Sequence, residues 1–539
     1  MLTLHAHSTH TFLTGTIPYG RLIELAKQHG SKYVSLTDTN GMYGLIQFAK
    51  LAQEEGIKPI LGSLIDDPID SEISILILAK NNEGYSQLCK IITTRKLKDD
   101  FRVIDLLRED VSNLFLMSSS LKLLDEAKDL IKKLPNFYIE LVVTKNQKKK
   151  TRELYQFAKD NGIKFVASQP AYFETKEDHF LHKVVSAIRE NSTIENIDES
   201  LLVDEEFYFH SPKEMETIWS KLPRALKNLE YIAENCNVDL KFSEYKFPVY
   251  PLPKGENAYS LLWKLAFEGL KNRYQPLTQT AIDRLKYELE VIEELGFSNY
   301  FLIVWDIVRE AERRKIITIG RGSAADSLVS YCLGFTQVDP IKHNLYFERF
   351  LNKGRKNPPD IDLDFSWKER DEIIKYVFDR YGYDKVAMIS TTVTFRARSA
   401  FRETAKAFGI PNEEISKYSK FIPWTSAKNL GNLSEKFPEA RSLDFSKDPW
   451  KRIVKVASRL SGFPRHLSIH PGGIVITPKP MTNFVALEYA KNKGLGLIIT
   501  QPDMYPIEDA GLIKIDLLSQ RSLGVLRDTM NAINDTNKL

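Results

Sequence analysis

Residues 358–365 read Pro-Pro-Asp-Ile-Asp-Leu-Asp-Phe, so that Asp360, Asp362 and Asp364 alternate strictly with apolar residues. In a β-strand this alternation places all three carboxylates on one face. Clustered carboxylates raise one another's pKa and destabilise a fold unless a cation neutralises them. Oxygen ligands of this kind suit Mg²⁺, and a pair of such ions can promote phosphoryl transfer. The alternative is an ordinary half-exposed strand with an acidic outer face.

Residues 511–518, Gly-Leu-Ile-Lys-Ile-Asp-Leu-Leu, form a second predicted strand. Lys514 and Asp516 share one face of this strand, and Ile513, Ile515 and Leu517 take the other. Asp516 alone would carry little information. Beside the first strand it would supply the third carboxylate of a metal site, and Lys514 would be available to a phosphate.

Residues 316–334, IITIGRGSAADSLVSYCLG, predict a short strand, a Gly-Arg-Gly-Ser turn and a helix opened by small residues. Such a turn offers backbone N–H groups and a positive helix end to a phosphate, and Arg321 and Ser323 add side-chain donors. The turn lacks the Gly-Lys-Ser/Thr of a P-loop, and an acidic strand follows where a dinucleotide-binding unit would continue. A simple helix-capping turn is the alternative.

Three further stretches are locally basic: 347–356 (FERFLNKGRK), 395–402 (FRARSAFR) and 463–470 (FPRHLSIH). Cations near a carboxylate cluster are what a triphosphate or a nucleic-acid backbone requires. At 395–402 a solvated basic helix face is the alternative, since Arg398 and Arg402 are four residues apart. The overall net charge of +4, from 75 basic and 71 acidic residues, carries no such signal.

Length and composition bound the class of protein. A chain of 539 residues is expected to form three or four domains, and 43% hydrophobic with 27% charged residues is typical of a globular protein. Three scattered cysteines favour a reducing compartment and argue against a zinc ribbon. The sequence shows neither a membrane-spanning stretch nor a signal peptide, so we expect a cytoplasmic protein with no membrane partner.

The chain divides near a proline-rich linker. Residues 1–205 alternate short apolar strands with amphipathic helices, which predicts an α/β barrel or a layered sheet. Residues 247–257 (FPVYPLPKGEN) contain three prolines and a glycine, which indicates a domain boundary. Long predicted helices follow this linker, and the polar motifs come after them.

Four motifs in order, GRGSAADSLVSYCLG, FERFLN, PPDIDLDF and GLIKIDLL, resemble the palm of bacterial DNA polymerase III α subunits, which are C-family DNA polymerases. The resemblance implies that two Mg²⁺ ions are bound by Asp360, Asp362 and Asp516, with Asp364 in support. It also implies contacts to the triphosphate of a dNTP from Arg321, Gly322, Ser323, Arg349, Arg355 and Lys514. Asp326 stands where relatives usually carry a small or amide residue.

The stretches YGYDKVAM, TFRARSAFRETAKAFG and GFPRHLSIHPGG resemble the error-prone branch of this family. The residues expected to contact DNA are Arg396, Arg398, Arg402, Arg465 and His466. The implied activity is template-directed addition of dNTPs to a primer 3′-hydroxyl on primer–template DNA, in replication or repair synthesis. Other replisome or repair subunits and a sliding clamp are the implied partners.

The first 200 residues resemble the family's PHP domain, from His5-Ala-His7-Ser8 through SLTDTNGMYG to EGYSQL. PHP enzymes hold up to three metals with clustered His, Asp and Glu. His5 and His7 are retained here as vestigial ligands. We expect no PHP metal and a structural role for the domain, because other ligand positions are occupied by Thr14, Thr39, Leu64, Pro170 and Tyr172.

The expected fold is therefore a multidomain α/β chain. Residues 1–240 would form a PHP-type α/β barrel, 241–397 and 463–539 the two parts of an α+β nucleotidyltransferase-like (polymerase-β-like) palm, and 398–462 a helical thumb. Fingers and C-terminal domains are expected to be absent. Two alternatives remain open: a PHP-type phosphoesterase or 3′-5′ exonuclease, and a non-catalytic DNA-binding fragment.

Overall fold

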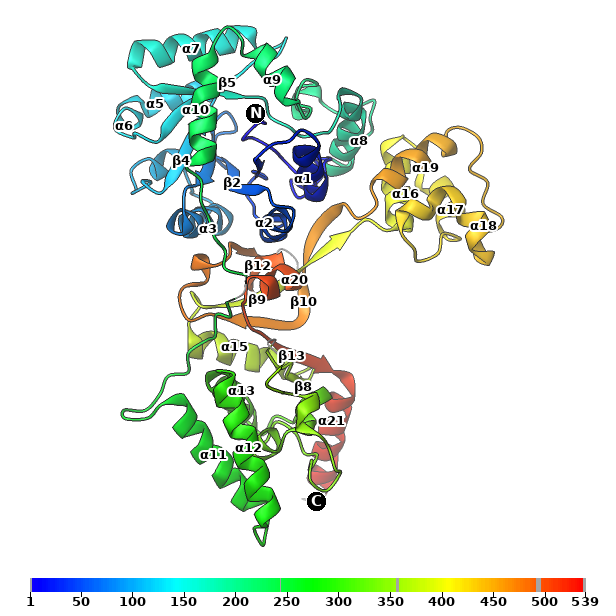
Figure 1. Cartoon of the computed structure of the whole chain (residues 1–539). Coiled ribbons are helices and arrows are strands. Elements are labelled where there is room, and N and C mark those ends of the chain that lie inside the picture. Colours follow the sequence, from blue (N-terminus) through cyan, green and yellow to red (C-terminus); the bar gives the residue numbers. More distant parts are fainter. Residues whose placement is uncertain (1, 243, 355–357, 491–495, 537–539) are drawn as a thin grey trace. The chain divides into compact units, whose positions relative to one another are not determined.

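The computed structural model describes residues 2–242, 244–354, 358–490 and 496–536 and contains two compact units (Figure 1). The first unit comprises Met1–Leu240, Thr391–Ser468 and Thr482–Asn492, and the second comprises Lys241–Ser390, Ile469–Met481 and Lys493–Leu539. Among the described residues, no helix has the length and apolar character needed to span a membrane.

The first unit is built on a six-stranded sheet with the strands in chain order. Its strands are β1 (Tyr33–Leu36), β2 (Lys58–Asp66), β3 (Ser74–Ala79), β4 (Leu114–Ser118), β5 (Phe137–Val142) and β6 (Lys164–Ser168). β2, β3 and β4 pair antiparallel, and the other neighbours pair parallel. β4 and β5 are buried along their whole length, as expected for strands covered on both faces.

Helices alternate with most of these strands, as the sequence pattern predicted, but β3 follows β2 directly with no helix in the described residues between them. The helices are α1 (Tyr19–Gln28), α2 (Leu45–Glu54), α3 (Asn82–Leu97), α4 (Val103–Leu106), α5 (Leu121–Glu126), α6 (Lys128–Ile131), α7 (Lys148–Asn161), α8 (His179–Arg189), α9 (Pro212–Ile218) and α10 (Pro223–Glu234). The short strand β11 (Leu487–Tyr489) also belongs to this unit, where it packs on α3.

The N-terminal segment joins the two outer strands of the curled sheet. Ala6 accepts a hydrogen bond from the backbone N–H of Thr37, just after β1. On the other side Ala171, just after β6, donates to His5 and accepts from His7. The expected mixed α/β architecture is confirmed, in the form of a curled sheet whose two edges are connected through residues 5–7.

Residues 398–462 are mainly helical and pack on the first unit. The helices are α16 (Ala397–Ala407), α17 (Asn412–Ser419), α18 (Leu433–Lys436) and α19 (Trp450–Arg459). Their shared core includes buried Phe401 and Ile453 together with Leu181 and Val185 of α8. This joint core makes the helical segment continuous with the packing of the first unit.

The second unit contains the strand order β12-β9-β10-β13-β8-β7. Their bounds are β7 (Thr318–Arg321), β8 (Asp362–Ser366), β9 (Val386–Thr394), β10 (Pro464–Ile476), β12 (Ile498–Asp503) and β13 (Lys514–Gln520). The helices are α11 (Ala258–Arg273), α12 (Gln279–Glu294), α13 (Ser298–Arg313), α14 (Leu328–Cys332), α15 (Arg370–Tyr381), α20 (Met504–Asp509) and α21 (Arg521–Thr536). A second mixed α/β region is thus confirmed beyond the proline-rich linker.

Helix α13 is the central packing element of the second unit. Its run from Tyr300 to Val304 is completely buried, and the helix contacts α11, α15 and β7. A helix that is apolar on nearly every side must be covered on nearly every side. The strands that carry the polar motifs therefore rest on a closely packed support.

Helix α11 packs closely against the end of α14 at Gly269. A Cβ atom at this position would lie 2.1 Å from the carbonyl oxygen of Cys332. Gly269→Ala should lower the free energy of unfolding by about 1–3 kcal/mol, because this clash outweighs the gain of about 1 kcal/mol in helix propensity. Urea unfolding followed by circular dichroism measures the change. Gly431→Ala, where a Cβ would meet open space, is the control and should be neutral.

Candidate metal and phosphate site

Three carboxylates converge where β8 and β13 run side by side. The two strands pair parallel with Asp516 directly opposite Asp362, and Asp360 lies two residues before Asp362. One oxygen from each of the three carboxylates lies within 4.8 Å of the others. Asp516 is buried, Asp362 is half-buried and Asp360 is exposed, so the cluster is open on one side. The structure brings together the three residues predicted as metal ligands.

Asp364 lies on the same strand but outside this group. Its Oδ2 atom is 3.2 Å from Nε of Arg321, whose strand β7 runs antiparallel to β8, and it accepts a hydrogen bond from Gln520. Nε of Arg321 is also 3.9 Å from Asp362. Asp364 therefore fixes the guanidinium of Arg321 beside the carboxylate cluster.

Lys514 supplies a second cation from β13. Its Nζ atom donates a hydrogen bond of 2.6 Å to Oδ2 of Asp516 and lies 3.9 Å from Oδ1 of Asp360. Burial alone would lower the pKa of Lys514, but the hydrogen bond and the two negative charges raise it above its ordinary value. The ammonium group stays protonated at neutral pH and partly neutralises the cluster.

The electrostatics of the cluster favour a bound cation. Burial, followed by the charges of Asp360 and Asp516, raises the pKa of Asp362 to about 6. In the described part of the chain, Oδ1 of Asp516 and Oδ1 of Asp364 are buried and receive no hydrogen bond. A buried carboxylate oxygen without a donor is costly, and a divalent cation would satisfy it. The oxygen-only donor set therefore fits Mg²⁺.

The predicted phosphate turn begins directly after Arg321. Gly322 has φ +73°, a conformation that glycine adopts without strain, and Gly322–Asp326 form a single 3₁₀ turn. The helix expected to open here begins only at Leu328. Gly322 and Ser323 thus stand at the end of β7, next to the strand that carries the carboxylates.

The start of α14 is occupied by a buried carboxylate from α12. Glu288 accepts hydrogen bonds from the N–H groups of Leu328 and Val329 and from the hydroxyl of Ser327. Arg284 pairs with Glu288 at 2.6 Å. The prediction that this helix end is offered to a phosphate was therefore wrong, because Glu288 already caps it. Sequence reasoning had no signal for Glu288, which reads as one charge in an amphipathic helix.

The basic stretch after this turn is described only in part. Arg349 is largely exposed, and its Nε atom lies 3.9 Å from Oδ2 of Asp326. Asp326 is itself buried, so the unusual carboxylate in the turn faces an arginine. Arg355 lies outside the described residues.

His470 is a site residue that sequence reasoning missed. It lies on β10, whose Gly473 pairs with Asp516, and its Nδ1 atom is 3.8 Å from Oδ1 of Asp516. Nδ1 accepts a hydrogen bond of 2.6 Å from the N–H of Gly473, which leaves the ring proton on Nε2. Burial lowers the pKa of His470, although Asp516 opposes this shift. The only sequence signal was its place in a family-like stretch.

The residues predicted to contact DNA lie on or beside α16, in the first unit. Arg398 donates to the carbonyl of Ile422, Arg402 donates to the hydroxyl of Ser419, and Arg465 pairs with Glu403 at 2.9 Å. Arg396 and His466 are exposed. Among the described residues, Arg465 alone of these four arginines pairs with a carboxylate, so the charges of Arg396, Arg398 and Arg402 are open to a further partner.

The predicted vestigial metal ligands are part of a buried hydrogen-bond chain. His5 contacts Glu140 at 2.7 Å and His7 at 2.9 Å, and His7 contacts Thr11, which donates to Asp38. All four imidazole nitrogens thus have protein partners. Burial, with the charge of His5, holds the pKa of His7 well below its ordinary value. A metal could bind here only by replacing these contacts. Sequence reasoning had missed the two carboxylates of this chain, Glu140 and Asp38.

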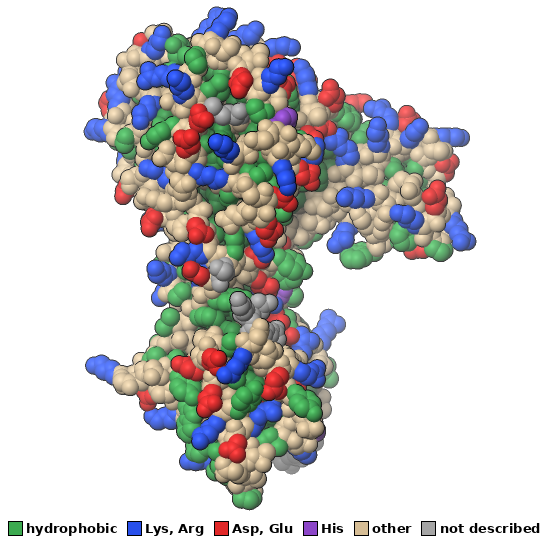
Figure 2. Space-filling view, viewed as in Figure 1, with side chains coloured by type: hydrophobic (Ala, Val, Ile, Leu, Met, Phe, Trp, Pro, Cys, Tyr) green, Lys and Arg blue, Asp and Glu red, His purple; other side chains and the backbone are tan. Residues whose placement is uncertain are grey.

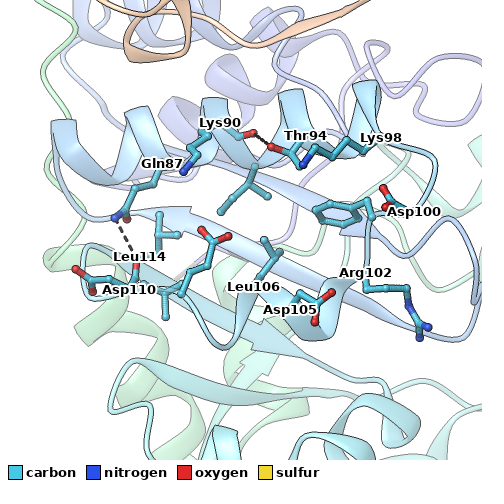
Figure 3. Close-up of a pocket in the computed structure, with 14 residues that line it drawn as sticks. Gln87, Lys90, Thr94, Lys98, Asp100, Arg102, Asp105, Leu106, Asp110 and Leu114 are labelled. Atoms are coloured by element: carbon cyan, nitrogen blue, oxygen red, sulfur yellow. Dashed lines mark hydrogen bonds between the residues drawn. The ribbon is translucent and has the colours of Figure 1, made fainter.

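The first unit also has a separate cavity of about 440 Å³ beside α3 (Figure 3). Apolar side chains such as Leu106 and Leu114 line it together with charges of both signs, among them Lys90, Lys98 and Asp105. None of the predicted site residues lines this cavity, and its mixed charge selects no class of ligand.

The carboxylate cluster, with a lysine and an arginine beside it, has the oxygen ligands that a divalent cation needs and cations that a phosphate could contact. Family models agree with this kind of site. The model of the bacterial DNA polymerase III alpha NTPase domain matches residues 260–519, and the PHP domain model matches residues 3–141.

Curated relatives cover nearly the whole chain. DNA polymerase III subunit alpha of Halalkalibacterium halodurans is 35% identical over 99% of this chain and 49% of its own length. The error-prone DNA polymerase of Symbiobacterium thermophilum is 33% identical over 99% of this chain and 52% of its own length, and the Bacillus subtilis α subunit is 32% identical over 98% and 49%. The chain spans about half the length of these relatives. It belongs to the family of bacterial DNA polymerase III α subunits and error-prone DNA polymerases, and it corresponds to their N-terminal half.

Asp362→Asn should stabilise the metal-free chain at pH 8. The folded pKa of about 6 lies above the ordinary value of 3.8, so ionisation of Asp362 costs stability that grows as pH rises to about 6. Because solvent screens the charges, we expect the variant to raise the free energy of unfolding by about 1 kcal/mol at pH 8. This increase should be smaller at pH 5. Mg²⁺ should raise the thermal midpoint of the wild type more than that of the variant. If Mg²⁺ left the thermal unfolding midpoint of the wild type unchanged at pH 8, the proposed metal site would be contradicted.

Glu288→Ala should destabilise the second unit by about 3–5 kcal/mol, because it leaves Arg284 and three donors without their buried partner. Glu290→Ala, at an exposed position on the same helix, should change stability by less than about 0.5 kcal/mol. Urea unfolding of both variants measures the difference. Equal stabilities would show that Glu288 does not hold the turn.

Proposed function

We propose that this chain carries the nucleotidyl-transfer centre of a DNA-directed DNA polymerase of the polymerase III α type. The reaction is template-directed addition of a dNTP to a primer 3′-hydroxyl. The observation that carries the proposal is the convergence of Asp360, Asp362 and Asp516 beside Lys514. The relatives named as DNA polymerases support it, since their similarity extends across this cluster.

Asp360, Asp362 and Asp516 would together hold two Mg²⁺ ions. When bound, such ions lower the pKa of the attacking hydroxyl and neutralise the charge on the pyrophosphate. The exposed side of the cluster, at Asp360, leaves room for the reacting groups. Asp516 is held in place by its hydrogen bond from Lys514.

The remaining site residues position the triphosphate. Arg321, oriented by Asp364, stands next to the carboxylates, and the Gly322–Ser323 turn offers backbone and hydroxyl donors beside it. Lys514 would exchange part of its contact with Asp516 for a phosphate oxygen. Arg349 and Arg355 add charge from the neighbouring basic stretch. The protein's contribution is positioning and charge stabilisation.

Residues 398–462 would act as a thumb that contacts primer–template DNA through Arg396, Arg398, Arg402, Arg465 and His466. Residues 1–240 would form a PHP domain that supports the palm, made of 241–397 and 463–539. Fingers, contacts to a sliding clamp and contacts to other replisome or repair subunits would come from the portion of the relatives that this chain does not match. We expect this DNA synthesis to take place in the bacterial cytoplasm.

Asp362→Asn should reduce primer extension at least about 1000-fold, because it would remove one carboxylate of the set that would hold the Mg²⁺ ions, together with its negative charge. Extension of a labelled primer with Mg²⁺ and dNTPs is measured for the purified chain, alone and joined to the C-terminal half of a relative. Asp283→Asn, at an exposed position on α12, is the control and should extend normally.

Near-normal extension by Asp362→Asn would refute the assignment. Release of mononucleotides that survives Asp362→Asn and disappears in the double variant His5→Ala, His7→Ala would instead locate an activity in the PHP domain.

A further inference from the structure

A continuous surface of the first unit is made by two segments, 391–402 and 415–431. Hydrogen bonds join them, from the N–H of Ala397 to the carbonyl of Thr425 and from Arg398 to the carbonyl of Ile422. Ile422 is completely buried in the helical core. The loop that carries it is therefore held firmly on the start of α16.

This surface is rich in basic side chains, although Glu403 directly follows the first segment and Glu413 and Glu414 directly precede the second. Neither segment contains an aspartate or a glutamate. Among the ion pairs of the described residues, none involves its six cations, which are Arg396, Arg398, Arg402, Lys417, Lys420 and Lys428. Figure 2 shows Lys and Arg side chains on the same helical part, interspersed with Asp and Glu. An accumulation of unpaired cations attracts a polyanion.

An aromatic side chain projects from the middle of these charges. Trp424 is 83% exposed, and Phe421, three residues earlier, is 40% exposed. The guanidinium group of Arg396 lies 4.9 Å from the centroid of the Trp424 ring. A large aromatic ring so open to water is unusual, because burying it would be strongly favourable. Its exposed surface is available to a flat partner.

The chemistry of the surface selects one class of partner. A polyanion with flat aromatic faces is a nucleic acid, and only unpaired bases offer those faces, since a duplex keeps its bases stacked inside. Membrane binding would need a wider apolar face than two aromatic side chains provide.

We propose that Trp424, braced by Arg396, is a stacking platform for an unpaired base of single-stranded DNA. Arg398, Arg402 and Lys420 would contact the adjoining phosphates. The inference deepens the proposed function and rests on it in one respect: a polymerase supplies the single-stranded template that the platform would hold.

The test uses the whole chain and fluorescence anisotropy of a labelled oligothymidylate of about 12 nucleotides, a length within the range that single-strand sites cover. Trp424→Ala should weaken binding at least about five-fold, the smaller end of what losing one base–aromatic stack costs. Trp424→Phe should retain most of the affinity. Tyr231→Ala, which removes a 52% exposed aromatic ring from α10 of the same unit, is the control and should bind normally.

Two further DNA ligands distinguish base stacking from contacts to the charged backbone. An abasic strand of the same length should bind Trp424→Ala and the wild type equally, and so should a blunt duplex. Lys420→Gln, at an exposed position, should reduce the salt dependence of binding by about 0.7 in the log–log slope, whereas Trp424→Ala should leave that slope unchanged.

Unchanged binding of oligothymidylate by Trp424→Ala would overturn the proposal, and so would an equal loss on the abasic strand or the duplex. The second result would mark a backbone contact without base stacking. Asp362→Asn should bind oligothymidylate like the wild type. If that variant also extended primers, the polymerase assignment would be refuted, but the proposed stacking role of Trp424 would not be.

Discussion

The parallel register of β8 and β13 is the constraint on which the site depends. It sets Asp362 directly opposite Asp516. A slip of one residue would turn Asp516 to the other face of the sheet and replace it with an apolar neighbour. The apolar residues between the carboxylates fix this register, because Ile361, Leu363, Ile515 and Leu517 are all buried on the opposite face.

The clustered negative charge is compensated from two sides. Lys514 reaches Asp516 and Asp360 along β13, and Arg321 reaches Asp364 and Asp362 from β7. The compensation is incomplete, since the pKa of Asp362 remains raised and, among the described residues, no group donates a hydrogen bond to Oδ1 of Asp516. Lys514 and Arg321 neutralise enough negative charge for the site to fold without metal. The negative charge that remains favours binding of a cation.

The sequence predicted Asp360, Asp362 and Asp516 through the family resemblance of their motifs, and strict alternation placed Asp360 and Asp362 on one strand face. Alternation alone did not separate Asp364 from the cluster. The sequence could not predict contacts that depend on tertiary packing. Glu288 occupies the helix end at Leu328, and His470 reaches Asp516 only through the pairing of β10 with β13. The same limit applies to the first unit. His5 and His7 were recognised, but the pairing of His5 with Glu140 depends on where the curled sheet places β5.

The central claim is that the three carboxylates form a site for divalent cations, and crystals of the chain soaked in Mn²⁺ test it directly. The account predicts anomalous density about 2.1 Å from oxygens of Asp362 and Asp516, the distance typical of such small octahedral ions. A map with no density at the cluster, with Lys514 still paired to Asp516, would contradict it.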